Sequence, residues 1–135
     1  MTRHELRDRI FKMLFRIEFF PAEELPEQWE AFRLDEENLD WEDTERTYVQ
    51  DKYEAILAKQ SELDELIDKN TEGWDIGRIG KVELAVLRLA AYELKYDDDI
   101  PDGVAIDEAV ELAKRYGREN SGSFVNAILS KIQKA

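Results

Sequence analysis

Apolar residues lie on every side of the helix predicted for residues 81–94, KVELAVLRLAAYEL. Its inner charges, Glu83, Arg88 and Glu93, point in different directions around the axis, so no continuous polar face remains for water. A helix of this kind is normally enclosed by other helices, and it is too short for a bilayer, which needs about 20 apolar residues. We therefore predict a buried central helix. Arg88 should pair there with a carboxylate or with helix C-terminal carbonyls, because an unpaired buried charge costs about 3–5 kcal/mol.

Six further segments carry apolar residues at helical spacing. The first follows a capping box of Thr2 and Glu5 and stops at Pro21, and a cap signal of Ser61 and Asp64 opens the fourth. The predicted helices, apart from the central one, are residues 2–20, 24–32 and 44–59, a short helix from 61, residues 103–116, and a last helix capped by Asn120 or Ser121. The pattern predicts an all-α protein, and 135 residues suit a single domain over residues 1–135.

Charge is distributed unevenly along the chain, whose net charge is -13. Residues 1–20 carry +2, residues 21–75 carry -14 and residues 76–135 carry -1, while residues 112–135 alone carry +4. Both ends are thus basic and the middle is acidic. This asymmetry suggests two partner surfaces, although a solvated acidic face is the simpler interpretation.

Residues that carry out catalysis or bind metals are scarce. The chain has one histidine, His4, and no cysteine, and it contains no P-loop, G-x-S-x-G or dinucleotide-binding motif. Asp97, Asp98 and Asp99 lack the spacing of a calcium loop and are interpreted as a loop rich in helix caps. Residues 77–80, GRIG, match the G-x-x-G of RNA-clamping loops, but without flanking strands they are interpreted as a tight turn. We expect no enzyme activity, no metal and no cofactor.

Basic and aromatic residues near both ends are the candidates for binding. Arg3, His4 and Arg7 lie within one turn of each other on the first helix, where a solvated helix face is the alternative interpretation. Phe124 lies at the edge of the last helix's apolar stripe, close in sequence to Arg118, and a buried core position is its default. Basic residues with an aromatic at the edge nevertheless suit a site where single-stranded nucleic acid stacks.

Three linked motifs carry a resemblance to a known family. These are KVELAVLRLAAYEL, DIPDGVAIDEAVELAKRYG and SGSFVNAILSKI, which occur in order with matching gaps, and the basic opening RHELRDRIFKMLFRIEF is similar too. Together they resemble the NusB transcription antitermination factors over about 75 residues. The chain departs from the family pattern at His4 and Glu5, where arginines are common, and at Asp107, which replaces an asparagine.

The resemblance implies an all-helical fold in two lobes around the central helix, without catalytic activity. It implies binding of single-stranded boxA-type RNA of ribosomal transcripts together with the ribosomal protein NusE, within the antitermination complex of RNA polymerase. By position, it assigns RNA contact to Arg3, His4, Arg7, Asn120 and Phe124, and NusE contact to Phe15 and Glu83. Physical reasoning adds Arg118, because phosphate contacts by Arg3, Arg7 and Arg118 would give a log–log salt slope of about -2.

Two other functions stay open at this stage. One is a helical adaptor that binds only proteins, and the other is a fragment equivalent to the N-terminal RNA-binding domain of a ribosomal RNA cytosine methyltransferase. The absence of a signal-like or membrane-spanning segment predicts a cytoplasmic protein that does not bind membranes. The sequence leaves open whether the free protein forms a homodimer.

Overall fold

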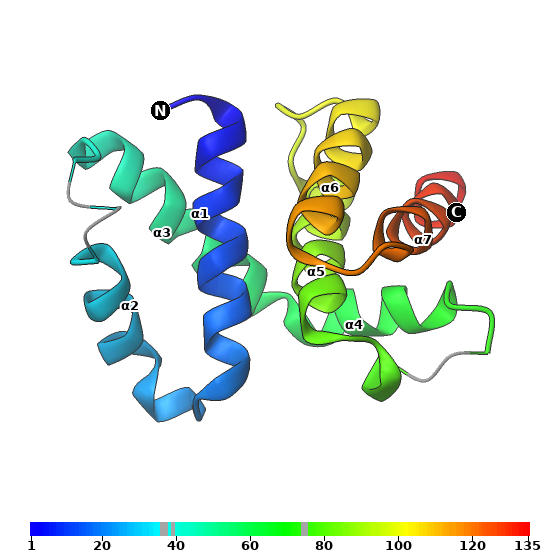
Figure 1. Ribbon diagram of the computed structural model, residues 1–135, viewed down its shortest axis with the longest axis horizontal. Coiled ribbons are helices and arrows are strands. Elements are labelled where there is room, and N and C mark those ends of the chain that lie inside the picture. Colours follow the sequence, from blue (N-terminus) through cyan, green and yellow to red (C-terminus); the bar gives the residue numbers. More distant parts are fainter. Residues whose placement is uncertain (36–37, 39, 74–75) are drawn as a thin grey trace. The chain divides into compact units, whose positions relative to one another are not determined.

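The computed structural model describes residues 1–35, 38, 40–73 and 76–135, and in these ranges it contains helices and no strand (Figure 1). The prediction of an all-α fold is confirmed. The α-helices are α1 Arg3–Arg16, α2 Leu25–Arg33, α3 Asp43–Ala58, α4 Gln60–Lys69, α5 Lys81–Tyr96, α6 Asp102–Tyr116 and α7 Ser121–Lys134. None of these described helices is long and apolar enough to span a bilayer.

The residue contacts cluster in two compact units, Met1–Ala55 and Ile56–Ala135, and the boundary falls within α3. In this respect the two lobes implied by the resemblance have a counterpart in the structure. The first unit contains α1, α2 and most of α3, and the second contains α4 to α7.

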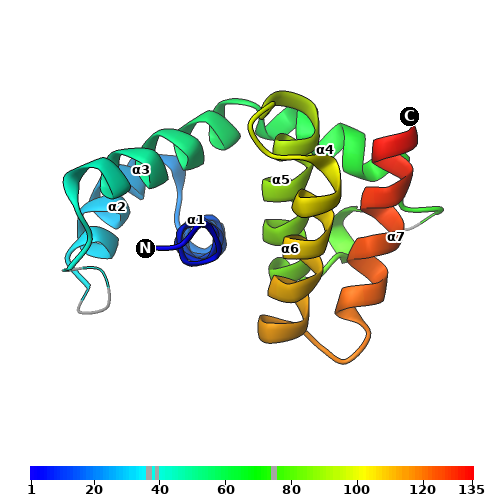
Figure 2. The same ribbon diagram turned by 90° about the horizontal axis from the view of Figure 1, so that it is seen from above.

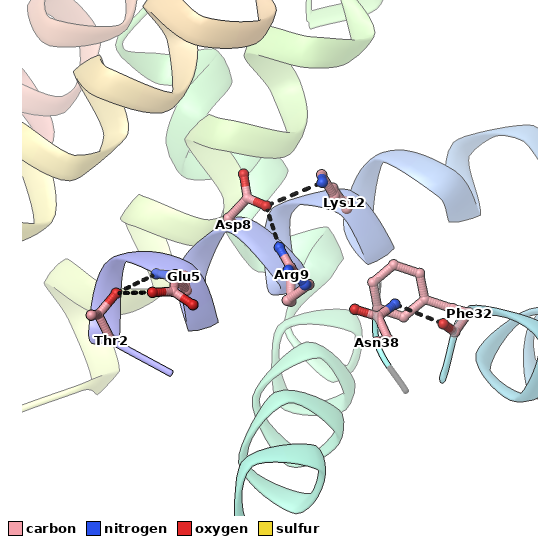
Figure 3. A network of polar contacts seen from close by, with 7 residues as sticks. All are labelled: Thr2, Glu5, Asp8, Arg9, Lys12, Phe32 and Asn38. Carbon is pink, nitrogen blue, oxygen red and sulfur yellow. Dashed lines mark hydrogen bonds and ion pairs between the residues drawn. The ribbon is translucent and has the colours of Figure 1, made fainter. Parts of the chain in front are cut away.

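In the first unit, local sequence signals set the helix ends. Thr2 is the N-cap of α1, and its hydroxyl accepts a hydrogen bond of 3.1 Å from the Glu5 backbone N–H, as the capping box predicts (Figure 3). Pro26 lies in the first turn of α2, where its missing N–H leaves no helix hydrogen bond unmade.

Aromatic side chains form much of the core of this unit. The ring centroid of Trp29 lies 5.5 Å from that of Tyr53 and 6.2 Å from that of Trp41, and all three side chains are buried. The Asn38 amide donates a 2.7 Å hydrogen bond to the Phe32 backbone carbonyl, which ties the segment after α2 back to that helix (Figure 3).

In the second unit, α5 is the central helix. It packs against α4, α6 and α7, and Figures 1 and 2 both show α5, α6 and α7 side by side. Its residues from Leu84 to Ala91 are all buried, including Arg88, which confirms the predicted enclosure.

The buried Arg88 has a carboxylate partner, as predicted from the free-energy cost of burying an unpaired charge. Its Nε and Nη2 atoms donate hydrogen bonds of 2.7 and 2.9 Å to the two carboxylate oxygens of Asp64 on α4, a two-point geometry that suits a guanidinium. The prediction that Ser61 and Asp64 cap the fourth helix is wrong, because α4 begins at Gln60 and Lys59 occupies its N-cap position. Asp64 lies within the helix, where its carboxylate holds the buried cation instead.

Candidate nucleic-acid interface

A pocket of about 220 Å³ lies in the second unit, where the starts of α5 and α7 meet the turn after α6. Its lining comprises Arg78, Ile79, Gly80, Glu83, Arg118, Asn120, Ser121 and Phe124. The structure therefore brings together four residues that the sequence analysis proposed for binding, namely Arg118, Asn120, Phe124 and Glu83. The first three were expected to contact RNA, and Glu83 a protein partner.

A chain of hydrogen bonds fixes the wall of this pocket. The Ser121 hydroxyl donates a 2.7 Å bond to Glu83 Oε1 and accepts a 2.8 Å bond from the backbone N–H of Arg118. Ser121 is buried, whereas Glu83 is partly exposed. One hydroxyl thus joins the first turn of α5 to the turn that carries Arg118 and Asn120.

Two glycines allow this close packing. A Cβ at Gly80 would lie 2.5 Å from Glu83 Oε2, and a Cβ at Gly117 would lie 2.6 Å from both the Ser121 hydroxyl and the Ala113 carbonyl oxygen. Gly117 has no room for a side chain, because the Ala113 backbone is one of its neighbours, whereas a side chain at Gly80 would displace the Glu83 carboxylate. The glycines therefore let the backbone approach Glu83 and Ser121 closely enough to form the pocket wall.

The pocket presents cations and an aromatic ring to solvent. Arg78 and Arg118 are exposed, and neither side chain forms an ion pair with any residue in the described ranges. Phe124 is partly exposed, so the default expectation of a fully buried ring does not hold. Asn120 occupies the N-cap position of α7, but its side chain makes no capping hydrogen bond. Its side-chain amide can therefore bind a ligand. Guanidinium groups, an amide and a ring face are the groups that bind phosphate and base.

The residues proposed on α1 differ in exposure. Arg3 is exposed and His4 is partly exposed, but Arg7 is only 3% exposed and interacts with other protein groups. Arg7 is thus not presented to solvent as its position in the sequence suggested. Beside this turn, the Met1 ammonium pairs with Glu45, which raises the pKa of the amine and lowers the pKa of the Glu45 carboxyl through their hydrogen bond.

Phe15, the other residue proposed for partner contact, lies in an aromatic cluster of the first unit. Its ring stacks 6.1 Å from Phe11 and meets the edge of Phe19 at 5.2 Å. Phe15, Phe19 and Phe20 line a shallow groove, and Phe19 is 56% exposed. An apolar surface of this kind, bordered by Lys12, Arg16 and Asp35, is typical of a protein-binding surface.

Sequence reasoning missed Arg78 and Ser121 as parts of the site. The GRIG segment was interpreted as a tight turn, and the structure has a single turn of 3-10 helix, η4 Ile76–Arg78, leading into α5. The break in the helical pattern begins at Trp74, but Trp74 and Asp75 lie outside the described residues. The G-x-x-G spacing of the GRIG segment was the available signal. In the described part of the chain, no group of three His, Asp or Glu side chains is placed to hold a metal ion.

The sequence model of the NusB family matches residues 4–134 of this chain. The chain belongs to the NusB family. The resemblance in the sequence motifs is thereby confirmed. The chain is 51% identical to the transcription antitermination protein NusB of Agathobacter rectalis over 97% of its own length and 98% of that protein. It is 43% identical to NusB of Lachnoclostridium phytofermentans, covering 98% of each chain.

Solved NusB structures share the fold. The structure of T. maritima NusB superimposes with a TM-score of 0.88 at 42% identity, covering 99% of this chain and 92% of that one. A second structure, described as the antitermination factors NusB and NusE in complex with dsRNA, matches with a TM-score of 0.83 at 29% identity, covering 99% of this chain and 98% of that one.

Proposed function

We propose that this protein is a cytoplasmic transcription antitermination factor that binds single-stranded boxA-type RNA of ribosomal transcripts together with NusE and so promotes processive transcription. The observation that carries the proposal is the pocket in the second unit, where Arg118, Asn120 and the partly exposed ring of Phe124 come together. Family membership supports it, because the relatives of nearly full coverage are NusB antitermination proteins.

The role of each pocket residue follows from its chemistry. Phe124 stacks on one base, which contributes about 1–3 kcal/mol and accepts any base because each has a π-face. Arg118 neutralises a phosphate, and Asn120 offers both a donor and an acceptor to a base edge. On α1, the exposed Arg3 and the partly exposed His4 add further contacts, whereas Arg7 is buried and does not present its charge to solvent.

So few contacts give weak binding to RNA alone. Phosphate contacts by Arg3 and Arg118 to a single strand correspond to a log–log salt slope of about -1.4. NusE therefore supplies much of the affinity in this proposal. Phe15 and the shallow groove around it provide an apolar contact for that partner, and the acidic charge of residues 21–75 attracts a basic ribosomal protein.

Nothing in this mechanism requires a bond to be made or broken. The protein acts by binding, and its specificity depends on how well the pocket holds a nucleotide of one strand. A duplex would keep its bases stacked and paired, so it could not place one on Phe124 without the cost of unpairing.

A binding titration tests the proposal. A labelled boxA-like RNA, a scrambled RNA of equal length and a boxA duplex are each titrated with the protein, with and without NusE. We expect tightest binding to the single boxA strand and a clear gain in affinity when NusE is present. Equal affinity for boxA and scrambled RNA would contradict the proposal, and equal affinity with and without NusE would contradict its cooperative part.

A further inference from the structure

We propose that Arg78 is a further RNA-binding residue, whose guanidinium holds the phosphate next to the base that stacks on Phe124. This inference rests on the proposed function, which assigns Arg118, Asn120 and Phe124 to the same pocket. Neither the sequence motifs nor the family resemblance assigned a role to Arg78, which belongs to the GRIG turn before α5.

The charges in the pocket favour an anion. Arg78 and Arg118 contribute one positive charge each from two different segments, and neither has an ion-pair partner among the described residues. The one carboxylate in the lining, Glu83, already accepts the Ser121 hydroxyl. Two cations against one carboxylate give the pocket a net charge of about +1, which a single phosphate would balance.

The size of the pocket favours one unit of a polymer over a free small molecule. Its volume of about 220 Å³ is below the range of about 300–1,000 Å³ that is usual for sites of small molecules. A single nucleotide, with the strand continuing over the surface on both sides, fits such a shallow site. The aromatic ring then receives the base, and the two guanidinium groups receive the phosphate next to it.

The backbone that carries Arg78 is held in place while its side chain is free to reach a ligand. Ile79, the next residue, is buried, and Gly80 packs against the Glu83 carboxylate. The Ile79 backbone N–H also donates a 3.1 Å hydrogen bond to the Ile76 carbonyl. Because the turn is already fixed, binding costs only the ordering of one long side chain.

The experiment measures boxA binding by Arg78→Ala and Arg78→Lys in the presence of NusE, at several salt concentrations. We expect Arg78→Ala to weaken binding by about tenfold, the lower end of what a charge-assisted hydrogen bond contributes. The log–log salt slope should become less steep by about 0.7. Arg78→Lys should retain most of the affinity and the wild-type slope, because a phosphate accepts either cation.

Lys69→Ala is the matched control, since Lys69 is an exposed cation of the same unit that lines a different pocket. It should change neither affinity nor slope, and unchanged circular dichroism should show that all variants are folded. If Arg78→Ala binds as tightly as the wild type while Phe124→Ala loses affinity, the role of Arg78 is refuted and the proposed function stands. If the wild type itself fails to distinguish boxA from scrambled RNA, the proposed function fails and this inference with it.

Discussion

The Ser121 side chain holds together the wall of the proposed RNA site. It is buried, and its one hydroxyl serves both the Glu83 carboxylate and the Arg118 backbone N–H. Substitution by alanine would leave that N–H and the carboxylate without their partner. Losing a buried hydrogen-bond partner costs about 1–3 kcal/mol.

We therefore expect Ser121→Ala to lower the free energy of unfolding by about 1–3 kcal/mol and to weaken boxA binding, since the turn carrying Arg118 and Asn120 loses its support. Urea unfolding and RNA titration measure the two effects. The control is Ser123→Ala, because Ser123 is exposed and its hydroxyl donates a 3.1 Å bond to the Asn120 carbonyl at the surface. Equal stability of the two variants would show that the Ser121 bonds contribute nothing particular to the fold.

For single residues, the sequence could predict that a buried charge has a partner but not which residue that partner is. The rule that buried charges are paired predicted a partner for Arg88, yet it could not select Asp64, which lies 24 positions away on another helix. The same holds for Glu83 and Ser121, separated by 38 positions. Arg78 was missed because the value of an exposed arginine depends on what lies beside it in space.

At the scale of elements, the turn between α6 and α7 determines where the pocket forms. Gly117 ends α6, and its backbone N–H donates a 2.8 Å bond to the Ala113 carbonyl. The helix predicted over residues 103–116 ends just before this glycine. The sequence did not show why a glycine is needed at position 117. The φ angle of Gly117 is -98°, so the reason is close packing and not a left-handed backbone.

Gly117→Ala should therefore destabilise the protein by about 1–3 kcal/mol, because the new Cβ would meet the Ser121 hydroxyl and the Ala113 carbonyl at 2.6 Å. The matched control is Gly103→Ala at the other end of the same helix, where a Cβ would have no neighbour within 4 Å. That substitution should stabilise α6 by about 0.5–1 kcal/mol through helix propensity. Thermal unfolding of both variants checks the signs, and destabilisation by both would refute the steric argument.

Helix positions were predictable where apolar periodicity and caps agreed. The sixth helix ends at Tyr116 as expected, and Thr2 caps α1 through its hydroxyl. The cap signal at Ser61 misled because α3 ends at Ala58 and α4 begins at Gln60, which leaves only Lys59 between them. The role of Asp64 is to pair with Arg88 on another helix, and its spacing from Ser61 does not reveal that role.

At the scale of the whole molecule, charge asymmetry and the family motifs carried the functional prediction. The net charge of -13 alone would argue against nucleic acid, but the pocket has two exposed arginines in the part of the chain where charge is nearly balanced. Composition could predict two classes of partner surface. It could not predict that Glu83, expected on the partner-binding surface, lies in the pocket with Arg118 and Phe124.

The proposed RNA site requires that the ring of Phe124, rather than another aromatic ring, receives an RNA base. Photocrosslinking tests it directly, with boxA RNA in which each uridine is replaced in turn by 5-iodouridine, which couples under near-ultraviolet light to an adjacent aromatic ring. The protein is bound together with NusE, irradiated and digested, and the crosslinked residue is identified by mass spectrometry. We expect one uridine position to crosslink to Phe124, and the crosslink to disappear in Phe124→Leu. Crosslinks at an exposed ring of the first unit, such as Phe19 or Phe20, with none at Phe124, would contradict it.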